Sequence, residues 1–292
     1  MPVVRCRPKL RGVRCFFVSD LHGREPRYAA LAAAVRRERP AAVFLGGDLL
    51  PHALTGGFAE DVLVPLFASL RDALRDHYPR VFLILGNDDP RREEVVILAA
   101  QERGLWEYLH MRRSELAGCA VYGYSHVPPT PFRLKDWERY DVSRFVDPGC
   151  VSPEEGLHTF PVPEGDLRHG TIATDLVTLV GEADVSRAVC LFHSPPYKTQ
   201  LDRAALDGRI VEHVPLDVHV GSIAIRRFVE SRQPLLTLHG HVHESARLTG
   251  AWRDRIGATW LVSAAHDGPE LALVRFDLEA PEDATRELLA LP

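Results

Sequence analysis

Short apolar runs alternate along the chain with longer amphipathic stretches, and many of the runs end directly before Gly, Asp, Asn or His. Such runs indicate buried strands, and the stretches between them have the periodicity of helices. The predicted strands are Val13–Val18, Ala42–Leu45, Val81–Leu85, Ala120–Tyr124, Ala188–Phe192, Leu235–Leu238, Thr259–Val262 and Leu271–Phe276. The predicted helices are Tyr28–Arg39, Phe58–Tyr78, Glu93–Glu102, Thr171–Gly181 and Ser222–Ser231. The alternation predicts an α/β protein.

Residues 126–170 interrupt this alternation, because they are rich in proline, glycine and charge and have no regular period. A segment of this length without a helix or strand pattern is typically a functional loop or a cap. A disordered linker is the alternative. The aromatic residues Phe132, Trp137, Tyr140 and Phe145 indicate instead that part of the segment packs.

The composition is that of a globular protein with a large core. Of the 292 residues, 46% are hydrophobic and 26% are charged. We expect a single domain spanning residues 1–292, with an irregular insertion or cap at about 126–170. The formal net charge of −5 argues against a nucleic acid polymer or an anionic membrane as a partner. The oligomeric state stays open.

The cysteines and the N-terminal segment favour a cytoplasmic protein. The five cysteines lie far apart, without a CxxC pair, which is typical of reduced thiols. They are Cys6, Cys15, Cys119, Cys150 and Cys190. The Arg-rich segment Met1–Arg14 precedes an apolar run, Cys15–Val18, that is too short for a signal peptide. No stretch approaches the ~20 apolar residues that a membrane-spanning helix needs.

Polar side chains follow five of the predicted strands at the point where each strand ends. They are Asp20 and His22 after the first strand, Asp48 after the second, Asn87 and Asp88 after the third, His193 after the fifth, and His241 and His243 after the sixth. A single such residue is more typical of a turn or a helix cap. Five groups in order indicate one shared crevice, because the carboxyl ends of strands in α/β sheets are where ligands bind.

The donor types at these positions indicate a metal site. The spacings Asp-x-His and His-x-His place two side chains on the same side of an extended segment, so both can reach one ion. Carboxylate and amide oxygens together with imidazole nitrogens suit Mn²⁺, Fe, Zn²⁺ or Ni²⁺. An all-oxygen calcium cage or an all-thiolate site is a poorer match.

From Ser19 to Glu244 the chain resembles the calcineurin-like metallophosphoesterases, whose ordered signature is D-x-H, G-D, G-N-H-[D/E], H and G-H-x-H. Within that superfamily it is similar to the prokaryotic predicted phosphoesterases related to cyclic-nucleotide phosphodiesterases. The stretches Ser194–Tyr197, His219–Ser222 and Gly240–Ser245 carry this second resemblance. The resemblance implies a four-layer α/β/β/α sandwich of two mixed sheets flanked by helices.

The resemblance also implies two divalent metal ions per chain, of which Mn, Fe, Zn and Ni are the candidates. By matching position, one ion would be held by Asp20, His22, Asp48 and His243, and the other by Asp48, Asn87, His193 and His241. Asp48 would bridge the two ions, and a metal-bridging hydroxide would be the nucleophile. The implied catalytic set is Asp48, Asn87, Asp88 and His193.

Four further residues are candidates for substrate contacts. Arg24 follows the Asp-x-His-Gly turn, and a guanidinium matches phosphate oxygens. Ser222 opens a predicted helix whose N–H groups could face an anion. His126 and His219, like His52, lie on segments that should approach the crevice. A surface arginine, an ordinary helix cap and structural histidines are the alternatives.

Two departures from the family signature bear on chemistry. Asp88 stands where many members have the histidine of G-N-H, so their usual proton donor is missing at this position. An unperturbed Asp has a pKa near ~3.9 and nearby dications lower it, so we expect an ionised Asp88. The turn Ser263–His266 replaces a Gly- and Asn-rich turn, and no phosphate contact is carried over to it.

We therefore expect an enzyme that hydrolyses a small phosphodiester, with a cyclic nucleotide or another nucleotide derivative as the candidate substrate. A phosphomonoesterase is the second hypothesis. A scaffold that uses the same fold to bind another protein is the alternative from a different class. It is disfavoured because buried acidic and imidazole groups are costly without a metal. A nuclease is disfavoured because the acidic balance offers no electrostatic track for a polynucleotide.

Overall fold

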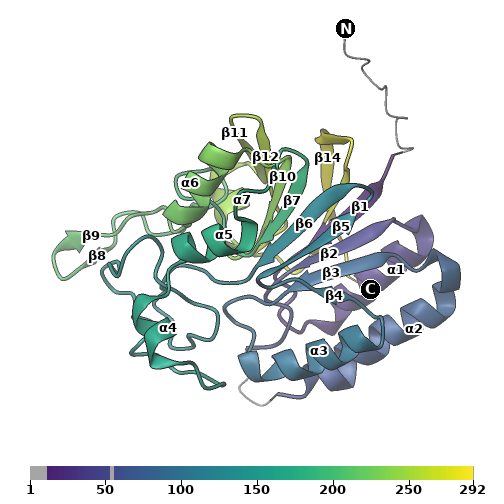
Figure 1. Cartoon of the computed structure of the whole chain (residues 1–292), viewed down its shortest axis with the longest axis horizontal. Coiled ribbons are helices and arrows are strands. Elements are labelled where there is room, and N and C mark those ends of the chain that lie inside the picture. The colour runs from purple at the N-terminus through teal and green to yellow at the C-terminus, as the bar shows by residue number, and fades with distance from the viewer. Residues whose placement is uncertain (1–11, 53–55, 292) are drawn as a thin grey trace, which may run out of the picture.

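The computed structural model describes residues 12–52 and 56–291. Two six-stranded mixed sheets lie face to face at its centre, and helices cover both outer sides (Figure 1). The predicted four-layer α/β/β/α arrangement is confirmed. The predictions for Cys6 and for the first residues of the Arg-rich N-terminal segment lie outside the described residues. Within the described ranges, none of the helices combines the length and the apolar character that a membrane crossing requires.

The first sheet has the order β14-β13-β1-β2-β3-β4. Its strands are β1 (Arg14–Val18), β2 (Ala42–Gly46), β3 (Arg80–Ile84), β4 (Glu107–Tyr108), β13 (Leu271–Asp277) and β14 (Ala280–Leu289). Strands β1 to β4 are parallel, whereas β13 and β14 each pair antiparallel with their neighbours. Three helices pack on its outer face, namely α1 (Glu25–Glu38), α2 (Val64–Leu74) and α3 (Glu94–Glu102).

The second sheet has the order β11-β12-β10-β7-β6-β5. Its strands are β5 (Arg112–Leu116), β6 (Cys119–Tyr124), β7 (Ala188–Phe192), β10 (Leu236–His239), β11 (Arg253–Ile256) and β12 (Thr259–Ser263). The four central strands are parallel, and β5 and β11 are antiparallel edges. Helices α5 (Ile172–Val180) and α6 (Ile223–Arg232) cover its outer face. The remaining elements are α4 (Glu164–His169), α7 (Ser245–Thr249) and the hairpin β8 (Ile210–Val211) and β9 (Val214–Pro215).

Both faces of each sheet are buried, which explains why the strands read as apolar runs. In β1, Phe16 and Val18 pack with the outer helices, whereas Cys15 and Phe17 lie in the layer between the sheets. That layer also contains Leu191 of β7. The alternation fixes each strand in register, because a shift by one residue would exchange its two apolar faces.

All eight predicted strands and all five predicted helices are present, with ends shifted by a few residues. The helix predicted over Phe58–Tyr78 begins as a π-helix (Ala59–Leu63) and ends as a 3₁₀ turn (Arg75–His77). The elements that were not predicted are β4, β5, β8, β9, β11, β14, α4 and α7. Strand β14 escaped prediction because it is an edge strand with mostly exposed side chains, so it lacks an apolar run.

The irregular segment 126–170 packs against the rest of the chain, as its aromatic residues predicted. Trp137 is fully buried and Tyr140 is 3% exposed, whereas Phe132 and Phe145 are 59% and 70% exposed. A buried ion pair between Lys135 and Glu138 lies at its centre. The segment is therefore an ordered cap, and we refer to residues 126–170 as the cap below.

The cap is attached to the chain that follows Asp88. The buried carboxylate of Asp136 accepts hydrogen bonds from the backbone N–H groups of Arg91 and Thr159, both at 2.8 Å. The backbone N–H of Arg92 donates to Thr159 Oγ1 at 3.1 Å. Asp136 thus links two parts of the cap, around Asp136 and Thr159, to the segment that begins at Arg91. Arg91 lies three residues after Asp88.

Candidate metal centre

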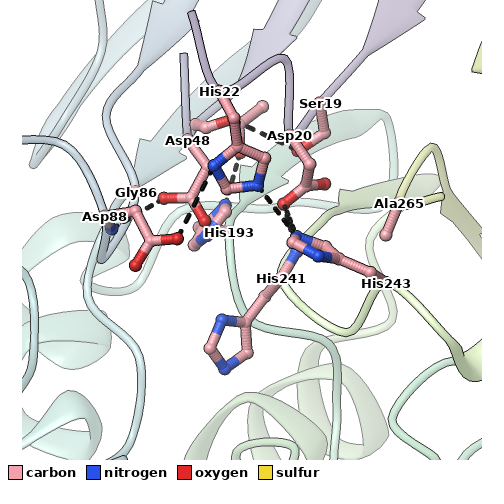
Figure 2. A network of polar contacts seen from close by, with 12 residues as sticks. Ser19, Asp20, His22, Asp48, Gly86, Asp88, His193, His241, His243 and Ala265 are labelled. Carbon is pink, nitrogen blue, oxygen red and sulfur yellow. Dashed lines mark hydrogen bonds and ion pairs between the residues drawn. The ribbon is translucent and has the colours of Figure 1, made fainter. Parts of the chain in front are cut away.

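The seven predicted ligands lie at the carboxyl ends of parallel strands from both sheets, where the two sheets meet. Figure 2 labels all of them except Asn87. They follow β1, β2, β3, β7 and β10. Contacts across the two sheets hold this edge together. His193 Nδ1 lies 2.7 Å from the carbonyl oxygen of Gly46, and the backbone N–H of His241 donates to Asp20 Oδ1 at 3.0 Å.

The first predicted ligand set comes together as one cluster. Asp20, His22, Asp48 and His243 each offer one ligand atom, and these atoms all lie within 4.8 Å of one another. The Nε2 atoms of His22 and His243 are 3.1 Å apart, and His243 Nε2 is 3.2 Å from Asp20 Oδ1. Asp20 Oδ2 is buried without a hydrogen-bond partner among the described residues. A buried carboxylate with an unpaired oxygen, in a cluster with two imidazoles and a second carboxylate, fits a bound cation.

The second predicted ligand set also converges. His193 Nε2 lies 3.3 Å from Asp48 Oδ2 and 3.2 Å from Asn87 Oδ1, and His241 Nδ1 lies 2.7 Å from the same Asn87 oxygen. The Gly46 carbonyl accepts a hydrogen bond from His193 Nδ1–H, which directs the Nε2 lone pair at these oxygens. Acceptors that face one another at this distance need a proton or a cation between them. Asp48 contacts both sets.

The charges of the metal-free chain show the same need for a cation. Burial would lower the pKa of His193, but the Asp48 carboxylate outweighs it and raises the pKa to about 10. The Asp20 carboxylate likewise overcomes burial and raises the pKa of His243 to about 9. Burial opposes ionisation of Asp20, yet His243 lowers its pKa to about 2. Protons on two imidazoles thus compensate two buried carboxylates, at positions where metal ions would do so.

Four of the seven ligands have a left-handed backbone. The φ angles of Asp20, His22, Asp48 and His241 are +59°, +49°, +51° and +72°. Such conformations cost roughly 1–3 kcal/mol each for residues other than glycine. The surrounding hydrogen bonds must therefore hold these turns in place.

Asp89 supplies several of those hydrogen bonds. Its fully buried carboxylate accepts the backbone N–H groups of Leu49 at 3.1 Å, Leu50 at 2.7 Å and Gly86 at 2.9 Å. The loops after β2 and β3 are thereby joined. Gly86 permits their close approach, because a Cβ atom there would lie 2.3 Å from Asp48 Oδ1.

Asp88 and His52 form a pair beside the first ligand set. His52 Nδ1 lies 3.2 Å from Asp88 Oδ2, and its ring stacks on His22 with centroids 4.7 Å apart and planes at 11°. His22 Nδ1 lies 3.6 Å from the same Asp88 oxygen, and His22, His52 and Asp88 form a second group whose donor atoms lie close enough together to hold a metal ion. In the metal-free chain, burial raises the pKa of Asp88 to about 8, with help from Asp48, whereas the expected lowering applies to a site that holds dications.

The four candidates for substrate contacts occupy different surroundings. Arg24 is exposed at the start of α1, next to the Asp20 turn. His126 is buried, with Nδ1 3.9 Å from the Asp175 carboxylate of α5. His219 Nδ1 contacts Asp202 at 2.8 Å.

Ser222 is fully buried and caps α6. It also donates a hydrogen bond to Asp141 at 2.5 Å. Its hydroxyl is therefore already engaged within the protein. The structure brings together the seven predicted ligands and Asp88, whereas His126, His219 and Ser222 make their contacts with other parts of the fold.

Together, the two packed mixed sheets and the oxygen and nitrogen donors at their edge define a protein of the metallophosphoesterase class. The family model described as calcineurin-like phosphoesterase matches residues 13–245, so the chain belongs to this family. The family uses a pair of divalent metal ions, and Asp20, His22, Asp48 and His243 form a group that could hold a metal ion. No protein among the curated sequences matches the chain.

Solved structures share the fold at low sequence identity. One crystal structure is 15% identical with a TM-score of 0.62, and the match covers 96% of this chain and 100% of the other. The crystal structure of TT1561 from Thermus thermophilus is 16% identical with a TM-score of 0.56, covering 96% and 100%. A dimetal phosphatase from Danio rerio is 12% identical with a TM-score of 0.51, covering 90% and 92%.

We expect the metal-free protein to lose stability as the pH rises above about 6.5. The folded-state pKa values of His193 and His243, about 10 and about 9, lie above the ordinary value of 6.5. Their protonation therefore stabilises the fold fully below pH ~6.5, and this contribution disappears as the protons leave. Thermal unfolding of chelated protein between pH 6.5 and 9 measures the effect.

Protein saturated with Mn²⁺ is the control for this measurement. Its unfolding midpoint should depend less on pH, because the ions replace the two protons. A midpoint of the metal-free protein that stays constant or rises over the same range would contradict the prediction.

Proposed function

We propose that the chain is a dinuclear metal-dependent phosphoesterase that hydrolyses a small phosphodiester. The observation that carries the proposal is the pair of converging ligand sets that share Asp48. When bound, two divalent ions, with Mn, Fe, Zn and Ni as candidates, would stabilise charge on phosphate oxygens and activate water. The chain itself supplies seven oriented donors, a buried edge between two sheets and a cap beside it.

The choice of a diester rests on the three stretches that resemble the cyclic-nucleotide phosphodiesterase branch. Two of them lie side by side, because the backbone N–H of Ser222 donates to Pro195 at 2.9 Å and that of Tyr197 donates to Ser222 at 3.0 Å. The third stretch contains His241 and His243. The first two stretches therefore pack against each other, and the third carries two of the candidate ligands, which supports a shared role in substrate selection. A phosphomonoester is the second candidate.

Asp48→Asn is expected to lower kcat/KM by at least about a thousandfold, because the bridging carboxylate belongs to both ligand sets. A panel of phosphomonoesters, linear diesters and cyclic nucleotides, assayed with Mn²⁺, Ni²⁺, Zn²⁺ or Mg²⁺, measures activity and preference together. Glu38→Gln, remote from the ligands on the last turn of α1, is the matched control and should retain activity.

Metal content separates the enzyme from the scaffold hypothesis. Elemental analysis of protein purified without chelator should give two metals per chain. A value well below one that Mn²⁺ does not restore would contradict the metal centre. Preference for monoesters across the panel would contradict only the choice of diester.

With Asp88 in place of the family histidine, the rate of hydrolysis should depend strongly on the acidity of the leaving group. Asp88 lacks an imidazole donor, and general acid catalysis typically contributes roughly 10²–10⁴-fold. We expect aryl phosphodiesters to be hydrolysed much faster than alkyl ones. Asp88→His should accelerate alkyl esters more than aryl esters, and the dependence of kcat on leaving-group pKa measures this.

His52→Gln tests whether His52, 3.2 Å from Asp88, replaces the missing donor. If it does, the variant should steepen the leaving-group dependence while metal content persists. A shallow dependence in the wild type, together with a hundredfold loss in Asp88→Asn on poor leaving groups, would show that Asp88 itself donates the proton.

The cap is proposed to form a wall of the substrate site. The Arg91 guanidinium carbon lies 5.2 Å from the centre of the Trp137 ring and 5.9 Å from that of Phe160. Phe160 is 51% exposed, so one side of this stack is open to solvent and could contact an aromatic group of a substrate. A deletion of residues 129–149 could test this role of the cap, but it would also remove the buried Trp137. A point substitution is therefore the better test.

Phe160→Ala should raise KM for diesters with an aromatic group by about three- to tenfold, since aromatic pairs contribute roughly 0.5–1.5 kcal/mol. Metal content and kcat should stay unchanged. Phe145→Ala removes a similarly exposed phenyl ring of the cap and serves as the matched control. Equal KM values in the two variants would argue against a substrate wall at Phe160.

A further inference from the structure

The guanidinium of Arg27 holds backbone next to the first ligand set. Arg27 lies in the first turn of α1 and is only 4% exposed. Its Nη1 donates to the Asp20 carbonyl oxygen at 2.6 Å, and its Nη2 donates to the Gly268 carbonyl oxygen at 2.6 Å. Nε donates to the Pro269 carbonyl oxygen at 3.4 Å. One side chain thus connects α1, the Asp20 turn and the turn between β12 and β13.

Asp20 is the ligand whose backbone needs this support. Its φ of +59° lies in the left-handed region, which an aspartate adopts at a cost. Its own N–H donates to Gly47 at 3.0 Å, so its carbonyl is the second point at which the turn can be fixed. Arg27 binds that carbonyl. The same residue must aim its carboxylate at the first metal, so the turn and the ligand geometry are coupled.

The charge of Arg27 does not explain its position. A cation near Asp20 repels a divalent ion, so charge alone would weaken metal binding. The hydrogen bonds of Arg27 go to neutral carbonyl groups and not to the Asp20 carboxylate. A planar guanidinium can reach three carbonyls at fixed angles, which a lysine cannot do. The geometry therefore favours a role in orientation.

We propose that Arg27 is a positioning residue for the first metal ion, acting on the Asp20 carboxylate through the Asp20 carbonyl. The inference rests on the metal centre of the proposed function. An orienting role and a purely electrostatic role of Arg27 predict opposite results. Removing the guanidinium weakens metal binding if orientation dominates. It strengthens metal binding if charge dominates.

The test measures Mn²⁺ binding to Arg27→Met and Arg27→Lys by competition with a chelator. In both variants, one of the two binding constants should fall by about ten- to a hundredfold, as is typical for partners that orient a ligand. The other constant should change little. The electron paramagnetic resonance spectrum at limiting Mn²⁺ should then shift from a coupled pair toward an isolated ion.

Arg275→Met is the matched control. Arg275 also ties α1 to the first sheet, because its Nε and Nη2 donate to Glu38 at 2.7 and 2.9 Å at the opposite end of the helix. It should lower thermal stability and keep both metal sites. Unchanged or tighter Mn²⁺ binding in Arg27→Met would overturn the inference, as would full wild-type binding in Arg27→Lys.

The wild-type protein distinguishes this inference from the proposed function. If it binds two metals but hydrolyses no phosphoric ester in the panel, the proposed function fails. If it is active and Arg27→Met keeps two sites of wild-type affinity, only the role of Arg27 fails.

Discussion

Two buried carboxylates between the ends of two sheets impose the constraint on which the rest of the site depends. Asp20 and Asp48 are each 1% exposed, and charge in such surroundings has to be compensated. In the metal-free chain His193 and His243 provide the compensation as imidazolium ions. Neighbouring hydrogen bonds orient the other candidate ligands. The Gly46 carbonyl fixes the ring of His193, and the Asp88 carboxylate accepts the Asn87 amide N–H at 3.0 Å.

The fold tolerates four left-handed ligands because rigid elements surround them. Each turn starts at the end of a strand that is buried on both faces, so the strand itself cannot move to relieve the strain. The Asp89 carboxylate joins the turn that contains Asp48 to the loop after β3 through backbone N–H groups, and Arg27 binds the carbonyl of the turn that contains Asp20. Four of the seven candidate ligands have this backbone strain. The stability of the site therefore depends on the stability of the sheets that hold the turns.

The sequence allowed the fold class to be predicted, because buried strands leave apolar runs, and the candidate ligands could be located because they follow directly after those runs. It did not reveal β14 or the hairpin β8–β9, whose exposed strands have no such run. The sequence could not reveal the role of Arg27 either. Its partners Gly268 and Pro269 are distant in the chain, and Arg27 binds their backbone carbonyls, which every residue has. Ser222 and Asp141 likewise meet only in the folded chain.

The division of the ligands between two sheets has a consequence for biosynthesis. The first ligand set needs Asp20, near the start of the chain, and His243, which the ribosome adds more than two hundred residues later. The first set is incomplete until His243 has been added and the two sheets have docked, so both steps must precede binding of an ion by all four residues. Once bound, an ion closes a loop of this length much as a crosslink would. An ion held by all four residues would thereby link the first sheet, whose strands lead to Asp20, His22 and Asp48, to the second, whose strand β10 leads to His243.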